Sequence, residues 1–399
     1  MKTTITLNEL SKKNCEALLR ENILDFWQTK MVDLEKGGFY GQMDNFGHLI
    51  PDANKGVILN TRILWTFSAA HRVLRDDNYK AMAHRAYDYL RRKFFDRELG
   101  GLYWELDAEG TPRDKKKQIY AQAFGIYALA EYYRITERRG VLSEAIALFQ
   151  LIEQYSLDTK RGGYLEAFDR EWKLLDDLRL SDKDANEAKT MNTHLHILEA
   201  YTNLYRVWKH PKLELAIREL IELFLERFID AQGHFHLFFS ERWSLKSHEC
   251  SYGHDIEGSW LLHEAAEVLG DKELLEKVEK ASITMANAAL RGMDVDGGLM
   301  NEGTARGVID TDKHWWPQAE ALVGFVNAKF ISQDLKYLGY AEKVWGFIQE
   351  KIIDHENGEW FWRVTREGEV IHTEDKTGPW KCPYHNGRAM IELIERLPR

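Results

Sequence analysis

Cysteine and positive charge are both in short supply in this sequence. Its 399 residues include only three cysteines, and 54 Lys+Arg stand against 64 Asp+Glu, for a net charge of −10. Cys15, Cys250 and Cys382 are too few for a disulfide framework, which favours a reducing compartment. The acidic balance argues against nucleic acid as the main partner, because binding phosphate groups requires a cationic surface.

Long hydrophobic runs are also missing. A charge-free stretch from Gln118 to Ala130 spans 13 residues, whereas a transmembrane helix needs about 20. The first ten residues, MKTTITLNEL, lack the apolar core of a signal peptide. No Ser/Pro-rich linker interrupts the chain. We therefore expect a cytoplasmic protein without a membrane partner, folded as one domain over residues 1–399, with a monomer as the favoured state.

Aromatic residues, in contrast, are abundant. The chain has 13 Trp, 17 Tyr and 18 Phe, which together make 12% of it. Large aromatic side chains can simply build a large core. They can also stack on the apolar faces of sugars, as in many carbohydrate enzymes. Composition alone leaves both interpretations open.

A glycine-rich pattern of alternating residues occurs six times. Its aligned glycines recur at intervals of 60 to 70 residues, and each copy predicts a β-hairpin because period-two alternation is bracketed by turn residues. The copies are GGFYGQMDNFG from Gly37, GGLYWELDAEG from Gly100, GGYLEAFDREW from Gly162, GHFHLFFSERW from Gly233, GGLMNEGTARG from Gly297 and GEWFWRVTREG from Gly358.

Stretches with the apolar spacing of helices lie between these copies. Two stretches follow each of the first five copies, one precedes the first copy, and one follows the last. The predicted helices cover Glu9–Thr29, Leu59–Leu74, Tyr79–Phe95, Ile119–Ile135, Val141–Tyr155, Met191–Trp208, Leu213–Ile229, Ile256–Leu269, Leu274–Leu290, Trp316–Ile331, Leu338–Ile353 and Pro383–Leu397.

Twelve helices in six pairs predict an all-α fold, an (α/α)6 barrel or toroid with short β-hairpins at one end. An open helical solenoid is the alternative, since helical repeats also stack without closing. The single helix at each end of the chain favours closure, because the two can pair with each other. Helices that follow a hairpin carry few charges and should form the inner ring. Helices that precede a hairpin are amphipathic and should form the outer ring.

Polar and aromatic side chains concentrate at the starts of the six inner helices. In the toroid these starts meet at one end of the barrel, so the concentration favours a shared site over unrelated packing residues. The residues are Asn60, Arg62 and Trp65; Tyr120 and Gln122; Asn192, His194, His196 and Glu199; His254, Glu257 and Trp260; Trp315, Trp316, Gln318 and Glu320; and Trp380, Tyr384, His385, Asn386 and Arg388.

Spacing along the helices refines this prediction. His254 and Glu257 are three residues apart, so they share a helix face and can hydrogen-bond. Asn192 and His196 are four apart and also share a face. His194 points elsewhere and is expected to pack between helices.

Several chemistries could use such a site. Zinc binding is disfavoured because His194 and His196 lie on different faces, and the chain has no HExxH motif and no cysteine cluster. Glycoside hydrolysis needs two opposed carboxylates, which Glu257 and Glu320 could supply, but it needs neither three histidines nor an arginine. A non-enzymatic binding toroid is disfavoured by the clustering of titratable groups.

Proton abstraction beside a carbonyl fits these residues better. Removal of the acidic C2 proton of an open-chain aldose gives an enediolate, whose oxygen Arg62 and one histidine can stabilise. Two further histidines on opposite faces of C2 can remove and return the proton near neutral pH without a metal. Return of the proton to C2 gives epimerisation, whereas delivery to C1 gives aldose–ketose isomerisation.

The same segments resemble the cellobiose 2-epimerases of the N-acylglucosamine 2-epimerase superfamily. The resemblance spans essentially the whole chain and rests on NTRILWTFSAAHR, YAQAFGIYALAEYY, MNTHLHILEAYTNLYRVW, YGHDIEGSWLL, DTDKHWWPQAEALVGF and WKCPYHNGR. It implies an (α/α)6 barrel with no metal and no cofactor. It also implies a small disaccharide substrate, with cellobiose converted reversibly to glucosyl-mannose and lactose to epilactose. A mannose isomerase-like enzyme or a mannobiose 2-epimerase on the same scaffold is the alternative.

Residue roles follow from the resemblance as well. His254 and His385 would form the acid/base pair, with His385 also assisting ring opening. His196 and Arg62 would stabilise the cis-enediolate, and Glu257 would orient His254. The implied sugar-binding residues are Tyr120, Asn192 and Glu320 for hydroxyl groups, Trp315, Trp316 and Trp380 for the two rings, and Asp184 for the distal sugar.

Overall fold

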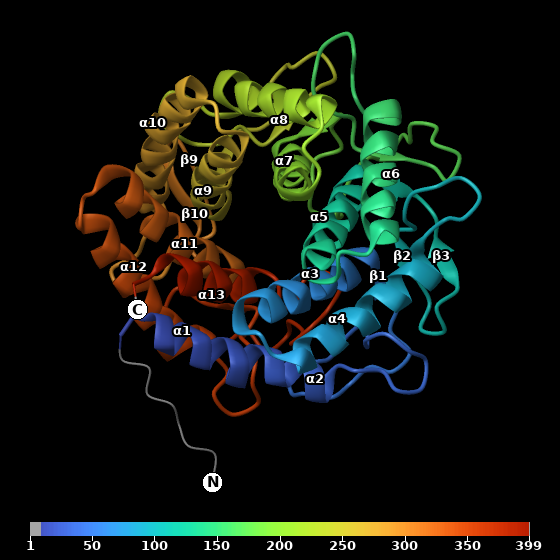
Figure 1. Cartoon of the computed structure of the whole chain (residues 1–399). Helices are drawn as coiled ribbons and strands as arrows, with labels where there is room; N and C mark the ends of the chain where they lie inside the picture. The colour runs from blue at the N-terminus through green and yellow to red at the C-terminus, as the bar shows by residue number, and fades with distance from the viewer. Residues whose placement is uncertain (1–8, 399) are drawn as a thin grey trace.

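Two concentric rings of helices form most of the structure, a computed structural model that describes residues 9–398 (Figure 1). The inner ring consists of α3 (Val57–Leu74), α5 (Ile119–Thr136), α7 (Met191–Val207), α9 (Tyr252–Leu269), α11 (Trp315–Ser332) and α13 (His385–Arg396). The residues MKTTITLN at the start of the chain, on which the leader expectation partly rested, lie outside the described part.

The outer ring carries the other helix of each pair. It consists of α1 (Lys12–Leu18), which continues through η1 (Leu19–Leu24) into α2 (Asp25–Lys30); α4 (Asp77–Tyr89) with η2 (Leu90–Phe94); α6 (Arg139–Tyr155); α8 (Pro211–Leu223) with η3 (Phe224–Phe228); α10 (Lys272–Ala289) with η4 (Leu290–Gly292); and α12 (Lys336–Phe347) with η5 (Ile348–Ile352). The twelve predicted helices and their assignment to two rings are therefore confirmed.

The ring is closed at the junction of the two chain ends. The last inner helix, α13, packs against both α1 and α3 (Figure 1). The single helices at the ends of the chain thus pair with each other, as predicted, and an open solenoid is excluded for the described residues.

Burial explains the two kinds of helix. In α5 every residue from Ile119 to Tyr132 is buried, because this helix contacts other helices on all sides. Outer α8 buries only one stripe, which is made of Leu213, Ala216, Ile217, Leu220 and Ile221. This difference matches the charge-poor and amphipathic sequences of the two classes. One hydrophobic core runs around the whole ring.

Short strands join neighbouring repeats at one end of the barrel. The turns within each hairpin are closed mainly by single bridges, such as that between Phe95 and Leu102. The two-residue or three-residue ladders instead link the strand before an inner helix to the next hairpin. These pairs are β1 (Lys55–Gly56) with β2 (Glu105–Leu106), β4 (Lys117–Gln118) with β5 (Ala167–Phe168), β6 (Lys189–Thr190) with β7 (Phe238–Phe239), β8 (Glu249–Ser251) with β9 (Glu302–Thr304), and β11 (Lys313–His314) with β12 (Arg363–Val364).

Two further strands extend these sheets. The strand β3 (Pro112–Asp114) pairs with β2, and β10 (Gly307–Asp310) pairs with β9. A bridge between Met43 and Thr377 joins the last repeat to the first in the same manner. The hairpin end of the ring is therefore closed as well as the helical part.

A buried ion pair recurs beneath these strands. In five of the six repeats a lysine that precedes the inner helix reaches the aspartate at the start of the hairpin turn, with Nζ–Oδ distances of 2.5 to 3.2 Å. The pairs are Lys55–Asp33, Lys117–Asp96, Lys189–Asp158, Lys313–Asp294 and Lys376–Asp354. The fourth repeat has Cys250 at the corresponding position, two residues before α9.

Within residues 9–398, none of the helices combines the length and the apolar character that crossing a membrane requires.

Candidate active site

The starts of the inner helices bring three histidines to one end of the barrel. His196 lies in the first turns of α7, His254 in the first turn of α9, and His385 begins α13. The ring of Trp316 lies 4.7 Å from that of His254 and 5.6 Å from that of His385, between centroids. The ring of Tyr120 lies 5.0 Å from that of His196. Residues from five inner helices thus share one site, as the sequence predicts.

Each of these histidines uses Nδ1 to contact the protein. Nδ1 of His196 is 2.8 Å from Glu199 Oε2, and Nδ1 of His385 is 2.6 Å from Glu320 Oε1. Nδ1 of His254 is 2.8 Å from Ser251 Oγ, the cap of α9. A carboxylate can only accept, so Nδ1 of His196 and of His385 carries the proton. In each ring Nε2 then remains available for a substrate.

One arginine holds the carboxylates behind these histidines. Arg388 Nη2 is 2.5 Å from Glu257 Oε1 and 2.7 Å from Glu320 Oε1, and Nη1 donates to Glu199 Oε1. All four side chains are about 1% exposed. Tyr384 Oη also donates to Glu199. A single guanidinium therefore connects the partner of His196 to the partner of His385.

This arrangement differs from two expectations about the carboxylates. Glu257 was expected to hydrogen-bond His254, but that imidazole contacts Ser251, and Glu257 instead contacts Arg388 and lies 3.9 Å from His385 Nδ1. Helix geometry allowed the pair but could not exclude a stronger partner from α13. Glu320 was expected at the sugar hydroxyls, yet its two oxygens bind His385, Arg388 and Trp260 Nε1.

Arg62 lies in an aromatic clamp on the other side of the site. Its guanidinium carbon is 4.4 Å from the ring centroid of Phe124 and 4.7 Å from that of Tyr384. Nη2 donates to Tyr120 Oη at 2.8 Å, and Nη1 donates to the carbonyl of Trp380. Its Nε is buried with no hydrogen-bond partner among the described residues. Arg62 thus keeps a donor and a positive charge available in the site.

Some of the remaining predicted sugar-binding residues line a neighbouring cavity, and others lie beside it. A cavity of about 520 Å³ is lined by Asp184, Asn192, His254 and Trp316, among others. Asn192 Oδ1 is buried and has no partner among the described residues. The ring of Trp380 packs 5.9 Å from that of Tyr120, between centroids. Trp315 is almost fully buried behind His385, at a centroid distance of 6.3 Å.

Burial and neighbouring charges set the protonation states of the site. Burial, together with the nearby His196, lowers the pKa of His254 to about 3. The pKa of His385 is well below its ordinary value because the ring is buried and faces the cations Arg62 and Arg388. Although burial opposes ionisation, Arg388 and His196 hold the pKa of Glu199 at about 2. His254 and His385 are therefore neutral bases near pH 7, and Glu199 is ionised.

Glu257 is a group beside the three histidines whose pKa lies near neutrality. Burial and the adjacent Glu320 raise its pKa to about 7. Its ionised form lies 3.9 Å from His385 Nδ1 and favours the imidazolium that forms when His385 takes a proton. We expect kcat/KM to rise with pH through an apparent pKa near 7 in the native protein.

In Glu257→Gln this inflection should be absent, and the activity should stay near the low-pH value of the native protein. Initial rates measured between pH 5 and 9 test this. An unchanged inflection in Glu257→Gln would assign it to a different group.

The sequence did not assign a role to several residues of the site. Arg388, Glu199 and Tyr384 appear among the polar residues of the helix starts, but nothing in their spacing indicates that Arg388 binds three carboxylates. The signal for Glu199 was present, because it follows His196 by three residues as Glu257 follows His254. Ser251 has the sequence position of a helix cap. His194 packs between helices as predicted, with Nε2 accepting from the Tyr164 amide at 2.8 Å.

A larger cavity lies at the opposite end of the barrel. Its volume is about 730 Å³, and its lining includes Arg72, Glu131, Arg206, Glu264 and Arg396. These charges pair with acids and bases of the same rim, as in Arg72–Glu131 and Arg206–Glu264. Apart from Glu199 on its inner wall, it contains none of the residues that surround the three histidines. The hairpin end is therefore the candidate active site.

Comparison with known proteins shows the family of this chain. The family model of N-acylglucosamine 2-epimerase matches residues 38–389. The cellobiose 2-epimerase of Bacteroides fragilis is 49% identical over 390 residues, which cover 97% of this chain and 100% of that one. The cellobiose 2-epimerase of Ruminococcus albus is 40% identical, with 95% of this chain and 97% of that one covered.

Solved structures of similar proteins share the fold of this chain. The structure of the cellobiose 2-epimerase from Bacillus thermoamylovorans superimposes with a TM-score of 0.92 at 42% identity and covers 97% of this chain and 99% of that one. A D-mannose isomerase structure, at 22% identity, has a TM-score of 0.85 over 100% of both chains. This more distant likeness shows a shared fold.

Proposed function

The chain belongs to the N-acylglucosamine 2-epimerase family, and we propose that it is a cellobiose 2-epimerase, an isomerase that inverts C2 of the reducing-end glucose in β-1,4-linked disaccharides. Cellobiose becomes glucosyl-mannose, and lactose becomes epilactose. The proposal is carried by the three imidazoles whose Nδ1 atoms are tied to the protein while Nε2 stays free, next to the clamped Arg62. The full-length identity of 49% to a cellobiose 2-epimerase supports it.

Proton transfer at C2 assigns a role to each group. After ring opening, which His385 assists, one of His254 and His385 removes the C2 proton through its neutral Nε2. The resulting cis-enediolate carries negative charge on oxygen, and Arg62 and His196 stabilise that charge. Rotation about the C2–C3 bond then presents the other face of C2 to the second histidine, which takes up a solvent proton on Nε2 and delivers it to C2. The first histidine releases the proton it removed to solvent, so that both imidazoles end neutral. No step calls for a cofactor or a metal ion.

The proposed disaccharide requires that the second sugar stay in place while the first rotates. Trp380 and Trp316 are half-buried at the edge of the site and offer ring faces for sugar stacking. The partly exposed carboxylate of Asp184, which also accepts from Ser181, borders the same cavity and is proposed to contact the distal sugar.

Trp380→Ala should therefore weaken turnover of cellobiose about tenfold more than turnover of glucose or mannose. The measurement is kcat/KM for both substrate classes. Trp208→Ala, at the far end of α7, is the matched control and should change both substrates equally. Equal losses on disaccharide and monosaccharide in Trp380→Ala would contradict a role in holding the second sugar.

The reaction itself is tested by incubation with cellobiose in D2O, with a chelator present, followed by NMR of the products. We expect glucosyl-mannose that carries deuterium at C2. A ketose product would assign an aldose–ketose isomerase, and free glucose would assign a glycosidase. If cellobiose is unchanged while mannobiose is converted, the enzyme is a mannobiose 2-epimerase.

The proposal also covers the cellular compartment, the domain organisation and the oligomeric state of the enzyme. All three cysteines are buried and free of disulfides, which suits a reducing compartment such as the cytoplasm. We take the whole chain as one catalytic domain that acts as a monomer.

A further inference from the structure

The fourth repeat departs from the others at three positions that meet in space. Cys250 replaces the lysine of the buried ion pair, as described above. His234 occupies the position of the second turn glycine, which is Gly38, Gly101, Gly163 and Gly298 in four other repeats. Asp255, in the first turn of α9, corresponds to Gln122 of α5 and Gln318 of α11.

Asp255 accepts the hairpin hydrogen bond that is typical of this position with one carboxylate oxygen, and its second oxygen is not needed for that bond. Gln122 and Gln318 each accept a hydrogen bond from a hairpin amide at 2.7 Å, from Leu102 and Leu299. Asp255 Oδ1 accepts from the Phe235 amide at the same distance. Its other oxygen, Oδ2, is 2.6 Å from His234 Nδ1. A carboxylate here therefore does more than the fold requires.

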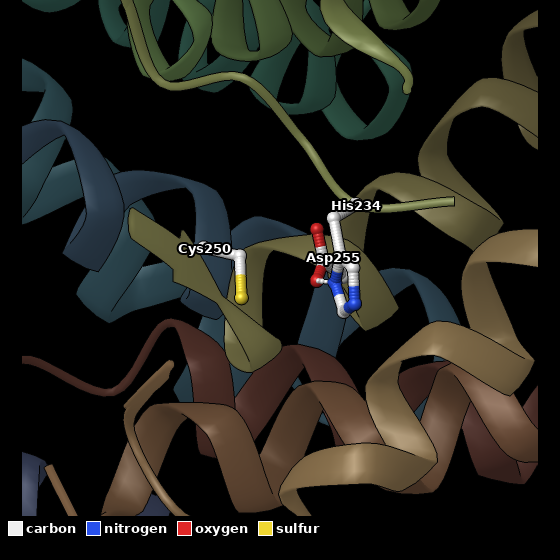
Figure 2. Close-up of side chains that lie close together, drawn as sticks. All are labelled: His234, Cys250 and Asp255. Atoms are coloured by element: carbon white, nitrogen blue, oxygen red, sulfur yellow. Dashed lines mark hydrogen bonds and ion pairs between the residues drawn. The ribbon is translucent and has the colours of Figure 1, made fainter. Parts of the chain in front are cut away.

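Figure 2 shows Cys250, His234 and Asp255 close together; they come from the strand β8, the hairpin turn and the first turn of α9. One nitrogen, one sulfur and one oxygen of these side chains all lie within 4.8 Å of one another, and all three residues are buried. A cavity of about 170 Å³ adjoins His234 and Cys250, and its other walls include Asp230, His236, His248 and Glu249. Space and further donor groups are thus present beside the cluster.

We propose that Cys250, His234 and Asp255 form a binding site for a divalent transition-metal ion of the zinc type. Thiolate, imidazole and carboxylate are the three side-chain ligands of protein zinc sites, and a water or a residue of the adjoining cavity supplies the fourth position. In a tetrahedral zinc site the imidazole nitrogen and the carboxylate oxygen are about 3.3 Å apart. The 2.6 Å contact between His234 and Asp255 must therefore open by less than 1 Å.

Metal binding changes the protonation of the cluster in a defined way. The thiol of Cys250 loses its proton, and the proton on His234 Nδ1 leaves or moves to Nε2. Arg291 Nη1 now lies 3.3 Å from that Nε2 and also donates to Gln232 Oε1 at 2.9 Å. The arginine keeps its Gln232 contact when Nε2 becomes a donor.

The site is structural and stands apart from the proposed catalysis. It joins the hairpin turn, β8 and the first turn of α9, so the bound ion fixes the helix start that carries His254. Glu257, Glu320 and His385 form a second group of possible ligands, but the guanidinium of Arg388 already binds both of its carboxylates. Cys250 variants separate the two groups, because the second one contains no cysteine.

The test uses the full-length protein, freed of metal by a chelator and titrated with Zn²⁺ and with Co²⁺. We expect one Zn²⁺ per chain by native mass spectrometry and a rise in Tm. With Co²⁺ we expect a thiolate-to-cobalt charge-transfer band, which reports a cysteine ligand directly.

Two variants follow from the internal symmetry of the barrel. Cys250→Lys restores the residue of the five other repeats and should fold with Asp230 as its partner, as Lys189 does with Asp158. It should retain epimerase activity, lose the charge-transfer band and bind Zn²⁺ at least about 100-fold more weakly. His234→Gln should weaken Zn²⁺ binding to a similar extent.

Absence of stoichiometric Zn²⁺ and Co²⁺ binding in the native protein would overturn the proposal, and so would equal binding by Cys250→Lys. The cluster would then be an ion pair that substitutes for the repeated Lys–Asp pair. In that case a protonated His234 is the cation. Burial lowers the pKa of His234, but Asp255 and Cys250 outweigh burial and raise this pKa to about 10.

Discussion

Replacement of either His254 or His385 by alanine is expected to lower kcat about 10²–10⁴-fold, because each removes one of the two groups that transfer the C2 proton. The fold should persist, since His254 makes its side-chain hydrogen bond to Ser251 alone and His385 makes its own to Glu320. Steady-state conversion of cellobiose, with circular dichroism as a check on folding, measures the effect.

Exchange of the C2 proton assigns each base to one face of the substrate. In D2O, a variant that lacks one histidine should still exchange the C2 proton of one epimer, through the remaining imidazole, without producing the other epimer. His254→Ala and His385→Ala should therefore exchange opposite epimers. Near-full activity in either variant would remove that residue from the mechanism.

The matched control is His194→Gln. His194 is on the same helix as His196, but its Nε2 accepts from a hairpin amide and its Nδ1 contacts the Thr190 carbonyl. Gln122 makes the corresponding contact to Leu102 in the second repeat, so glutamine can replace this histidine. We expect turnover within about threefold of the native value, since substitutions away from the chemistry act mainly through stability.

Arg388→Met is the second large expected effect. It leaves Glu199, Glu257 and Glu320 close together without their shared cation, and it frees the carboxylates that orient His196 and His385. Loss of one partner from a buried charge network costs about 3–5 kcal/mol of unfolding free energy. We also expect kcat to fall about 10²–10³-fold, comparable with the loss of one preorganised donor, while KM changes little because Arg388 lies behind the histidines.

A purely structural role for Arg388 would lower stability and leave the pH profile unchanged. A positioning role predicts that Arg388→Lys, which keeps the charge but cannot bond three carboxylates in a plane, folds and shows a shifted pH dependence of kcat. Arg396→Gln is the control at the other end of α13, where Arg396 contacts Glu392 and Asn327. It should leave the pH profile of kcat in place.

The helices and the closed ring could be predicted from the sequence because they follow from local information. Apolar spacing gave the helix bounds to within a few residues, except at α9. That helix begins at Tyr252 rather than Ile256, since Ser251 caps it before the apolar period starts. The pairing of strands between successive repeats could not be predicted, because the two-residue ladders carry too little alternation to define a partner.

The sequence predicted which residues make up the site, but it did not predict the hydrogen bonds and ion pairs among them. The helix starts contained every histidine and carboxylate that meets there. Which carboxylate binds which histidine depends on the relative placement of α7, α9, α11 and α13, and no spacing within one helix encodes it. Arg388 shows this most clearly, because its role exists only when acids from three other helices lie around it.

Closure by α1, α13 and α3 has a consequence for the evolution and engineering of this fold. Since the last inner helix packs against both the first helix and the first inner helix, ring order does not depend on where the chain starts. A circular permutant that joins the present ends and opens at the exposed turn Glu137–Arg138 would retain every neighbour of the three histidines. The catalytic geometry therefore depends on how the helices pack around the ring, and not on the point of the ring at which the chain begins.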